Sequence, residues 1–142
     1  MKKVVLVGHC GPDSSYLRMA VASADKGIMV IVADDSEHLQ KILSDGAGPD
    51  LLLLNRELSW GFAQSEGVEL IRHLRTTHPQ IKTMLVSNYP EAQAEAMQAG
   101  AYPGFGKREI GSPRVGQVIR DALSAGAPAS TTSSAATSSQ SQ

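Results

Sequence analysis

The residue best placed to take part in chemistry is Asn55, which ends the run Pro-Asp-Leu-Leu-Leu-Leu-Asn at residues 49–55. Four consecutive leucines predict a strand buried on both faces, because a half-exposed strand would alternate apolar and polar side chains. In open parallel sheets, ligands bind beyond the carboxyl ends of the strands. An amide there forms hydrogen bonds, but it is not a carboxylate nucleophile and adds no charge to a cation site.

His9 and Cys10 follow the first predicted strand, where they invite a metal or redox interpretation. Adjacent side chains diverge, and the other histidines lie on elements that should not converge here, so we favour a structural role for His9. Cys10 precedes a predicted helix, whose N-terminus lowers a thiol pKa, and a reactive cysteine stays open as an alternative. The loop from Gly8 to Gly11 can also cradle an anion on backbone N–H groups.

These residues need a framework, and the chain alternates strand and helix signals to provide one. Strands are predicted at residues 3–7, 28–33, 51–55, 82–86 and 102–106, and each is followed by a helical pattern. Five such units predict an α/β fold of three layers, a doubly wound five-stranded parallel sheet with helices on both faces. The chain is too short for a closed eight-unit barrel.

Composition narrows the classes of function. The 142 residues are 42% hydrophobic and 19% charged, which is ordinary for one globular domain. No apolar run approaches the length of a membrane-spanning helix, so we expect a cytoplasmic protein without membrane contact. A net charge of -1 gives no support for nucleic-acid binding, and a single cysteine excludes an internal disulfide. We expect a domain at residues 1–125 and a disordered Ser/Thr/Ala-rich tail at 126–142.

Four strings together resemble one family. They are PDLLLLN, EGVELIRHLR, MLVS ending at Ser87, and AGAYPGFGK ending at Lys107. In this order they resemble the receiver domain of bacterial two-component response regulators, which has a flavodoxin-like fold. The resemblance covers about residues 3 to 125 and implies a signalling domain.

The resemblance also implies an acidic pair that holds Mg²⁺ after the first strand, and a phosphoacceptor aspartate at the end of the third. The acidic pair falls on Gly8 and His9, or on His9 and Cys10 if the loop is shifted by one residue. The phosphoacceptor position falls on Asn55. None of these residues is a carboxylate, so a degenerate receiver without metal, cofactor or catalytic residue is predicted.

Two further family positions are retained, a hydroxyl at Ser87 and an ammonium at Lys107, whereas the aromatic switch position falls on Gly104. With the family's carboxylates missing, Lys107 must find backbone carbonyls, the Asn55 oxygen, Glu57 or water, because a buried unpaired ammonium is costly. Glu57 is the carboxylate that we consider as its counter-charge.

The other acidic groups near the predicted strand ends are assigned to helix starts. Asp34 and Asp35 lie too close in sequence to Asn55 to be the missing metal ligands, and with Ser36 they are expected to cap a helix. Asp13 is expected to begin the first helix, although it could bend back towards a cation.

The loop at residues 56–65 is longer than a usual βα connection and carries two large aromatics, Trp60 and Phe62. It either covers the site as a lid or grips a partner.

The sequence therefore predicts a phosphorylation-independent pseudo-receiver that acts as a protein-protein interaction module and binds a signalling protein or itself. The resemblance implies the fourth helix, fifth strand and fifth helix as the face for a homodimer. The alternatives are a small-molecule or anion sensor at the strand ends, and an enzyme of flavodoxin-like fold that uses Cys10 or His9.

Overall fold

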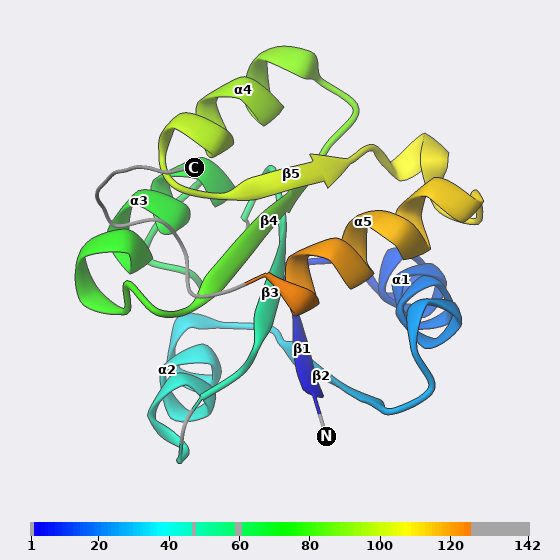
Figure 1. Cartoon of the computed structure of the whole chain (residues 1–142). Helices are drawn as coiled ribbons and strands as arrows, with labels where there is room; N and C mark the ends of the chain where they lie inside the picture. Colours follow the sequence, from blue (N-terminus) through cyan, green and yellow to red (C-terminus); the bar gives the residue numbers. More distant parts are fainter. Residues whose placement is uncertain (1, 47, 59–60, 126–142) are drawn as a thin grey trace, which may run out of the picture.

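A computed structural model describes residues 2–46, 48–58 and 61–125 (Figure 1). The strands are β1 (Lys2–Val7), β2 (Ile28–Ala33), β3 (Leu51–Asn55), β4 (Lys82–Val86) and β5 (Tyr102–Phe105). The helices are α1 (Gly11–Ala24), α2 (Ser36–Ser44), α3 (Gly67–Thr77), α4 (Pro90–Gln98) and α5 (Pro113–Ser124), with a 3₁₀ turn η1 (Lys107–Glu109) before α5. The predicted tail at 126–142 lies outside the described residues.

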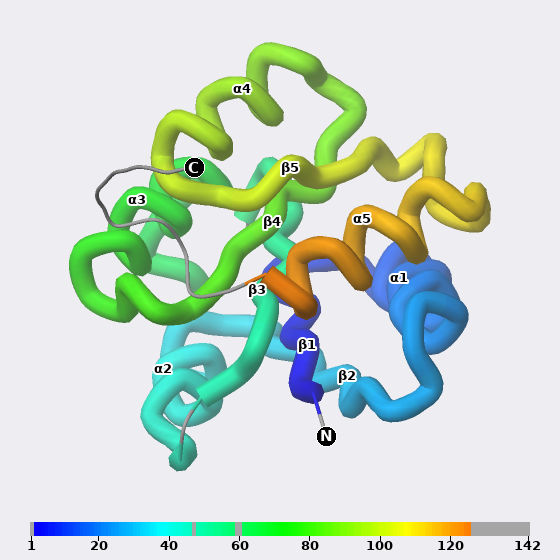
Figure 2. The backbone as a smooth tube through the Cα atoms, viewed as in Figure 1, coloured from blue at the N-terminus to red at the C-terminus, as the bar shows by residue number. Residues whose placement is uncertain are grey.

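The sheet has the strand order β2-β1-β3-β4-β5, and every neighbouring pair is parallel. Helices α2, α3 and α4 cover one face, while α1 and α5 cover the other (Figure 1). Figure 2 shows the same order as a tube, from β5 at the top of the view to β2 at the bottom. The predicted doubly wound five-stranded fold is thus confirmed.

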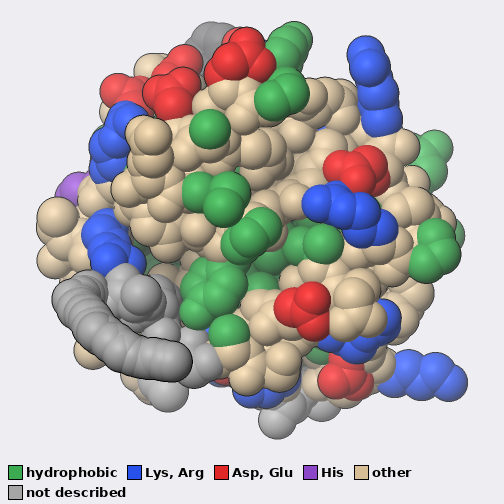
Figure 3. Space-filling view, turned by 45° about the horizontal axis from the view of Figure 1, so that its top comes forward, with side chains coloured by type: hydrophobic (Ala, Val, Ile, Leu, Met, Phe, Trp, Pro, Cys, Tyr) green, Lys and Arg blue, Asp and Glu red, His purple; other side chains and the backbone are tan. Residues whose placement is uncertain are grey.

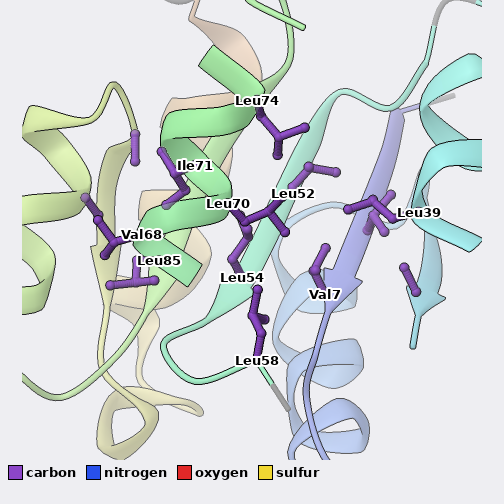
Figure 4. Packing of buried hydrophobic residues seen from close by; sticks show 14 of the residues in the cluster. Val7, Leu39, Leu52, Leu54, Leu58, Val68, Leu70, Ile71, Leu74 and Leu85 are labelled. Atoms are coloured by element: carbon purple, nitrogen blue, oxygen red, sulfur yellow. The ribbon is translucent and has the colours of Figure 1, made fainter. Parts of the chain in front are cut away.

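The leucine strand β3 joins the two halves of the core. Leu52 and Leu54 pack with residues of α2, α3 and α4, whereas Leu51 and Leu53 pack with those of α1 and α5. All four side chains are completely buried. Figure 4 shows Leu52 and Leu54 pointing towards α3 and its residues Leu70, Ile71 and Leu74. The unbroken apolar run follows from this position, because both faces of a central parallel strand meet helices.

The first helix begins earlier than the sequence suggested. Asp13 was expected to begin it, but α1 starts at Gly11 with Cys10 in the N-cap position and no side-chain cap. Pro12 lies in the first turn, where its missing N–H costs no helical hydrogen bond. In contrast, Asp35 caps α2 as predicted, since its side chain accepts a hydrogen bond from His38 N at 2.7 Å.

The two edge strands differ in how they end the sheet. β5 has four residues, includes Pro103, and has a register irregularity against β4 between Met84 and Val86. β2 has six apolar residues, Ile-Met-Val-Ile-Val-Ala, and keeps a continuous register with β1. A proline and a register irregularity both protect a sheet edge from pairing with another strand. β5 has both features, and β2 has neither.

Lys82, the first residue of β4, fixes the end of α5. Its Nζ donates hydrogen bonds to Ala122 O at 2.8 Å, to Leu123 O at 3.2 Å and to Ala125 O. These carbonyls belong to the last turn of α5, where a cation compensates the unpaired backbone acceptors. The orange end of α5 accordingly reaches the sheet in Figure 2. Within the described residues, no helix is long and apolar enough to cross a membrane.

Candidate functional site

Asn55 lies at the carboxyl end of β3, as the sequence predicted, and its amide group is engaged. Nδ2 donates to Gly8 O at 3.2 Å and to Glu57 O at 2.9 Å. The first bond joins the end of β3 to the exit of β1, and the second holds the start of the following loop. A carboxylate could donate neither bond. Asn55 therefore fixes the backbone at this edge of the sheet.

Gly8, the first of the degenerate acidic positions, is closely covered. Its φ is +74°, and a Cβ built there would approach Leu58 Cδ2 to 2.5 Å. Leu58 is buried, and the half-buried Phe62 packs against the same core cluster. The space that an acidic side chain would need at residue 8 is filled by hydrocarbon.

The loop that carries Leu58 is bound to the start of α2. Ser36 N donates to Gly61 O at 2.8 Å, and Ala63 N donates to Ser36 Oγ at 2.9 Å. Gly61 itself has a φ of +89° and lies against Asp35. Of the lid and the partner-gripping interpretations, Phe62 fits the lid. Trp60 lies outside the described residues.

His9 is buried and forms one hydrogen bond. Its Nε2 donates to Leu53 O at 2.8 Å, while Nδ1 is buried and has no hydrogen-bond partner in the described structure. Burial lowers the pKa of His9 to about 4, the bond to Leu53 opposes this shift, and the positive Lys107 adds to it. His9 is thus a neutral ring that joins the β1 exit to β3.

Cys10 is an exposed, free thiol. Among the residues that the structure describes, no group of three or more His, Cys, Asp and Glu side chains is placed to hold a metal ion.

Lys107 forms an ion pair with Asp13, with Nζ and Oδ2 3.0 Å apart. This hydrogen bond lowers the pKa of Asp13, with smaller contributions from Cys10 and His9. The sequence suggested Glu57 as the counter-charge, but Glu57 pairs with Arg56 at 3.5 Å. Asp13 pairs with Lys107 because α1 starts at Gly11, which places Asp13 in the first turn of the helix. The cation towards which the Asp13 carboxylate points is the ammonium of Lys107.

Ser87 is buried at the end of β4, and its Oγ accepts a hydrogen bond from Tyr89 N at 3.1 Å. A cleft of about 240 Å³ brings Ser87 together with Asn55 and Lys107. Its rim includes Arg56, whose guanidinium lies 4.7 Å from the centre of the Tyr89 ring. The three family positions of the third, fourth and fifth strands therefore meet in space.

Gln93 is a structural contact that the sequence did not suggest. Its Nε2 donates to Leu85 O at 2.9 Å, Ser87 O at 3.1 Å and Phe105 O at 3.3 Å. One side chain from α4 thereby holds the ends of β4 and β5.

Gly104, the aromatic switch position of the family, is a close backbone contact. A side chain there would run into Leu85 O and into the amide of Gln93. The irregular pairing of β5 with β4 brings the two backbones together at this point. The amide of Gln93 thus lies beside the position from which an aromatic side chain would extend.

We expect Gln93→Met to destabilise the domain by about 2 kcal/mol, because it removes the two N–H groups that the three partly buried carbonyls share. Chemical unfolding followed by circular dichroism measures this difference. Gln98→Met, at an exposed position of the same helix, is the matched control and should change the stability by less than about 0.5 kcal/mol. Equal effects of the two substitutions would contradict a role for Gln93.

No protein-family model matches the chain, and no curated protein matches its sequence. Solved structures do match its fold. The signal receiver domain of an HD domain-containing protein from Pseudomonas fluorescens Pf-5 has a TM-score of 0.70 and 18% identity, over 86% of this chain and 86% of that one. The receiver domain of NtrX from Brucella abortus has a TM-score of 0.62 and 25% identity, over 84% and 97%.

A third match is the signal receiver domain of a DNA-binding response regulator from Colwellia psychrerythraea 34H. Its TM-score is 0.68 with 12% identity, and the similarity covers 88% of this chain and all of that domain. These structures establish the class of the fold, which is that of response regulator receiver domains. At such identities the likeness concerns the fold.

Proposed function

We propose that the chain is a phosphorylation-independent pseudo-receiver that acts as a protein-protein interaction module in bacterial signal transduction. The observation that carries the proposal is the amide of Asn55, which stands at the phosphoacceptor position and donates to Gly8 O and Glu57 O. Because both bonds require an N–H donor, the group serves the backbone in a way that a phosphorylated side chain cannot.

Two neighbouring contacts support the same conclusion. Leu58 lies where a metal-binding carboxylate at residue 8 would extend, and the apolar contact disfavours a hydrated cation. Lys107 already has a carboxylate partner in Asp13. The retained ammonium is therefore compensated within the chain, and its presence does not require a phosphoryl group.

The anion-sensor alternative finds less support in the same cleft. The amide of Asn55 and the ammonium of Lys107 both have protein partners there, and Arg56 lies beside Glu57. An anion would compete with these partners for the same groups. The enzyme alternative rests on Cys10 or His9. The thiol lies beside Asp13, which is paired with Lys107, and the Nε2 of His9 is bonded to a backbone carbonyl.

We place the partner on the face of α4, β5 and α5, the face that the resemblance implies. Met97 on α4 and Pro103 on β5 are exposed, while Tyr102 and Val118 are half-buried. Figure 3 turns this end of the molecule towards the viewer and shows hydrophobic side chains gathered between charged ones. An apolar centre with a charged rim suits a protein partner, either a signalling protein or a second copy.

The test of phosphorylation independence is an NMR titration with Mg²⁺ and beryllofluoride, which imitates a phosphoryl group on an aspartate. We expect the amide resonances to stay in place, because Asn55 cannot bind this group covalently and no carboxylate pair holds the metal. Mg²⁺ alone and fluoride alone are the controls. Saturable shifts centred on Asn55, Ser87 and Lys107 would overturn the proposal.

The interaction face is tested separately with two exposed methionines, Met97 on α4 and Met19 on α1. Partners captured by the wild-type chain should be lost with Met97→Lys and kept with Met19→Lys, as quantified by mass spectrometry. Loss with both variants, or with neither, would contradict the placement of the partner on the α4 face.

A further inference from the structure

The edge strand β2 presents an open backbone edge. Of its six residues, Met29 is 45% exposed and Ile28, Val30, Ile31 and Val32 are only half-buried. The strand has no charge, proline or register break within it, in contrast to β5 at the opposite edge. Native sheets normally protect such an edge, so an unprotected one points to a pairing partner.

The outward backbone groups of β2 can be assigned from one hydrogen bond. Gly8 N donates to Ala33 O, so the backbone groups of Ala33 face β1. Successive residues of a strand direct their N–H and C=O groups to opposite sides. The groups of Ile28, Val30 and Val32 therefore point away from the sheet, where the strand order ends.

We propose that β2 pairs in antiparallel orientation with β2 of a second copy of this chain, about a two-fold axis at Val30. In this register Val30 faces its own counterpart, and Ile28 faces Val32 of the other copy. All the outward donors and acceptors of these three residues then form hydrogen bonds, and the two five-stranded sheets become one continuous sheet. The contact is isologous, so it closes at two chains.

Charge complementarity selects a second copy as the occupant. Continued past the ends of β2, the same register brings Lys26, in the turn before the strand, towards Asp34, the residue that follows it, at both ends of the pair. Both side chains are exposed, and within the described structure neither has an ion-pair partner. In one chain the six extended residues of β2 lie between them and span about 20 Å, so they cannot pair with each other.

Sedimentation equilibrium and amide hydrogen exchange test the pairing on the unmodified chain. We expect a monomer–dimer equilibrium, with the amides of Ile28, Val30 and Val32 gaining protection as the protein concentration rises. In a monomer these three amides face solvent and exchange rapidly. A chain that remains monomeric at millimolar concentration, or a dimer without protection at these amides, would overturn the inference.

A charge exchange tests the register. Lys26→Glu alone and Asp34→Lys alone should each raise the dimer Kd by about tenfold, because each sets like charges at both ends of the pair. The double variant Lys26→Glu/Asp34→Lys should return the Kd to within about threefold of the wild type. Absence of this rescue overturns the register, since the two residues cannot interact within one chain.

Val30→Pro tests the hydrogen bonding at the two-fold axis. Proline removes the outward N–H of Val30 while leaving the β1 side of the strand intact, a position where edge strands accept it. Circular dichroism checks that the variant folds, and the expected result is a monomer. A dimer that withstands Val30→Pro contradicts pairing through β2. Loss of that dimer with Met97→Lys would assign the contact to the α4 face instead.

Discussion

Gly8→Asp, which introduces the first carboxylate of the family's acidic pair, is expected to destabilise the domain by about 3 kcal/mol rather than to create a metal site. The residue has a φ of +74°, which costs an L-amino acid about 1–2 kcal/mol. The new Cβ would also lie 2.5 Å from Leu58 Cδ2, so a buried leucine must move. Urea unfolding of the variant and the wild type, with and without Mg²⁺, measures the difference.

Two alanine variants separate these costs. Gly8→Ala introduces the same Cβ without charge and should lose nearly as much stability as Gly8→Asp. Gly46→Ala is the matched control, because Gly46 has a φ of +57° but open space around its Cβ position. It should lose only about 1 kcal/mol. Equal losses at Gly8 and Gly46, or a gain in stability of Gly8→Asp with Mg²⁺, would contradict the role of Leu58.

The stability of the domain should fall by up to about 3 kcal/mol as the pH drops from 6.5 to 4, because His9 is buried as the neutral ring. Its pKa is about 4 in the folded chain and 6.5 as the ordinary value, so the unfolded chain binds the proton more readily. The contribution is complete above pH 6.5 and is lost as the pH falls towards 4. Urea unfolding at a series of pH values measures it.

His9→Gln is the control for this titration, since it keeps an N–H donor near Leu53 O and removes the ionisable ring. The slope of stability against pH between 6.5 and 4 should be much smaller in this variant. Asp13 contributes in a separate range, because its lowered pKa makes it lose stabilisation only below its ordinary value of 3.8. An unchanged slope in His9→Gln would assign the effect to other groups.

Much of the fold could be predicted because the responsible signals are local. Four leucines in succession require a strand covered on both faces, and Leu51 to Leu54 are indeed completely buried. The cap of α2 at Asp35 follows from a short polar side chain before an amphipathic helix. The placement of Asn55, Ser87 and Lys107 around one cleft follows from the parallel sheet, which brings successive strand ends to one edge.

The partners within the site could not be predicted, because they depend on small shifts between elements. The choice between Asp13 and Glu57 as the counter-charge of Lys107 is decided by where α1 begins, and helix boundaries are the least certain part of a sequence interpretation. Residue types alone also leave open whether a long apolar loop folds inwards. Leu58 and Phe62 pack inwards here because glycine at residue 8 leaves room for them.

Gln93 was missed for a different reason. Its helix is rich in alanine and gave no sign that one polar side chain turns towards the sheet. The three acceptors of its amide come from β4, the loop after it, and the end of β5, which are brought together only in the folded chain. Contacts of this kind have no periodic signature in the sequence.

Lys82 fixes where the described part of the chain ends relative to the cleft. By binding the carbonyls of the last turn of α5, its ammonium holds residue 125 at the amino ends of the strands. Asn55 and its cleft lie at the carboxyl ends, on the opposite side of the sheet. The last described residue and the cleft of Asn55 therefore lie at opposite poles of the domain.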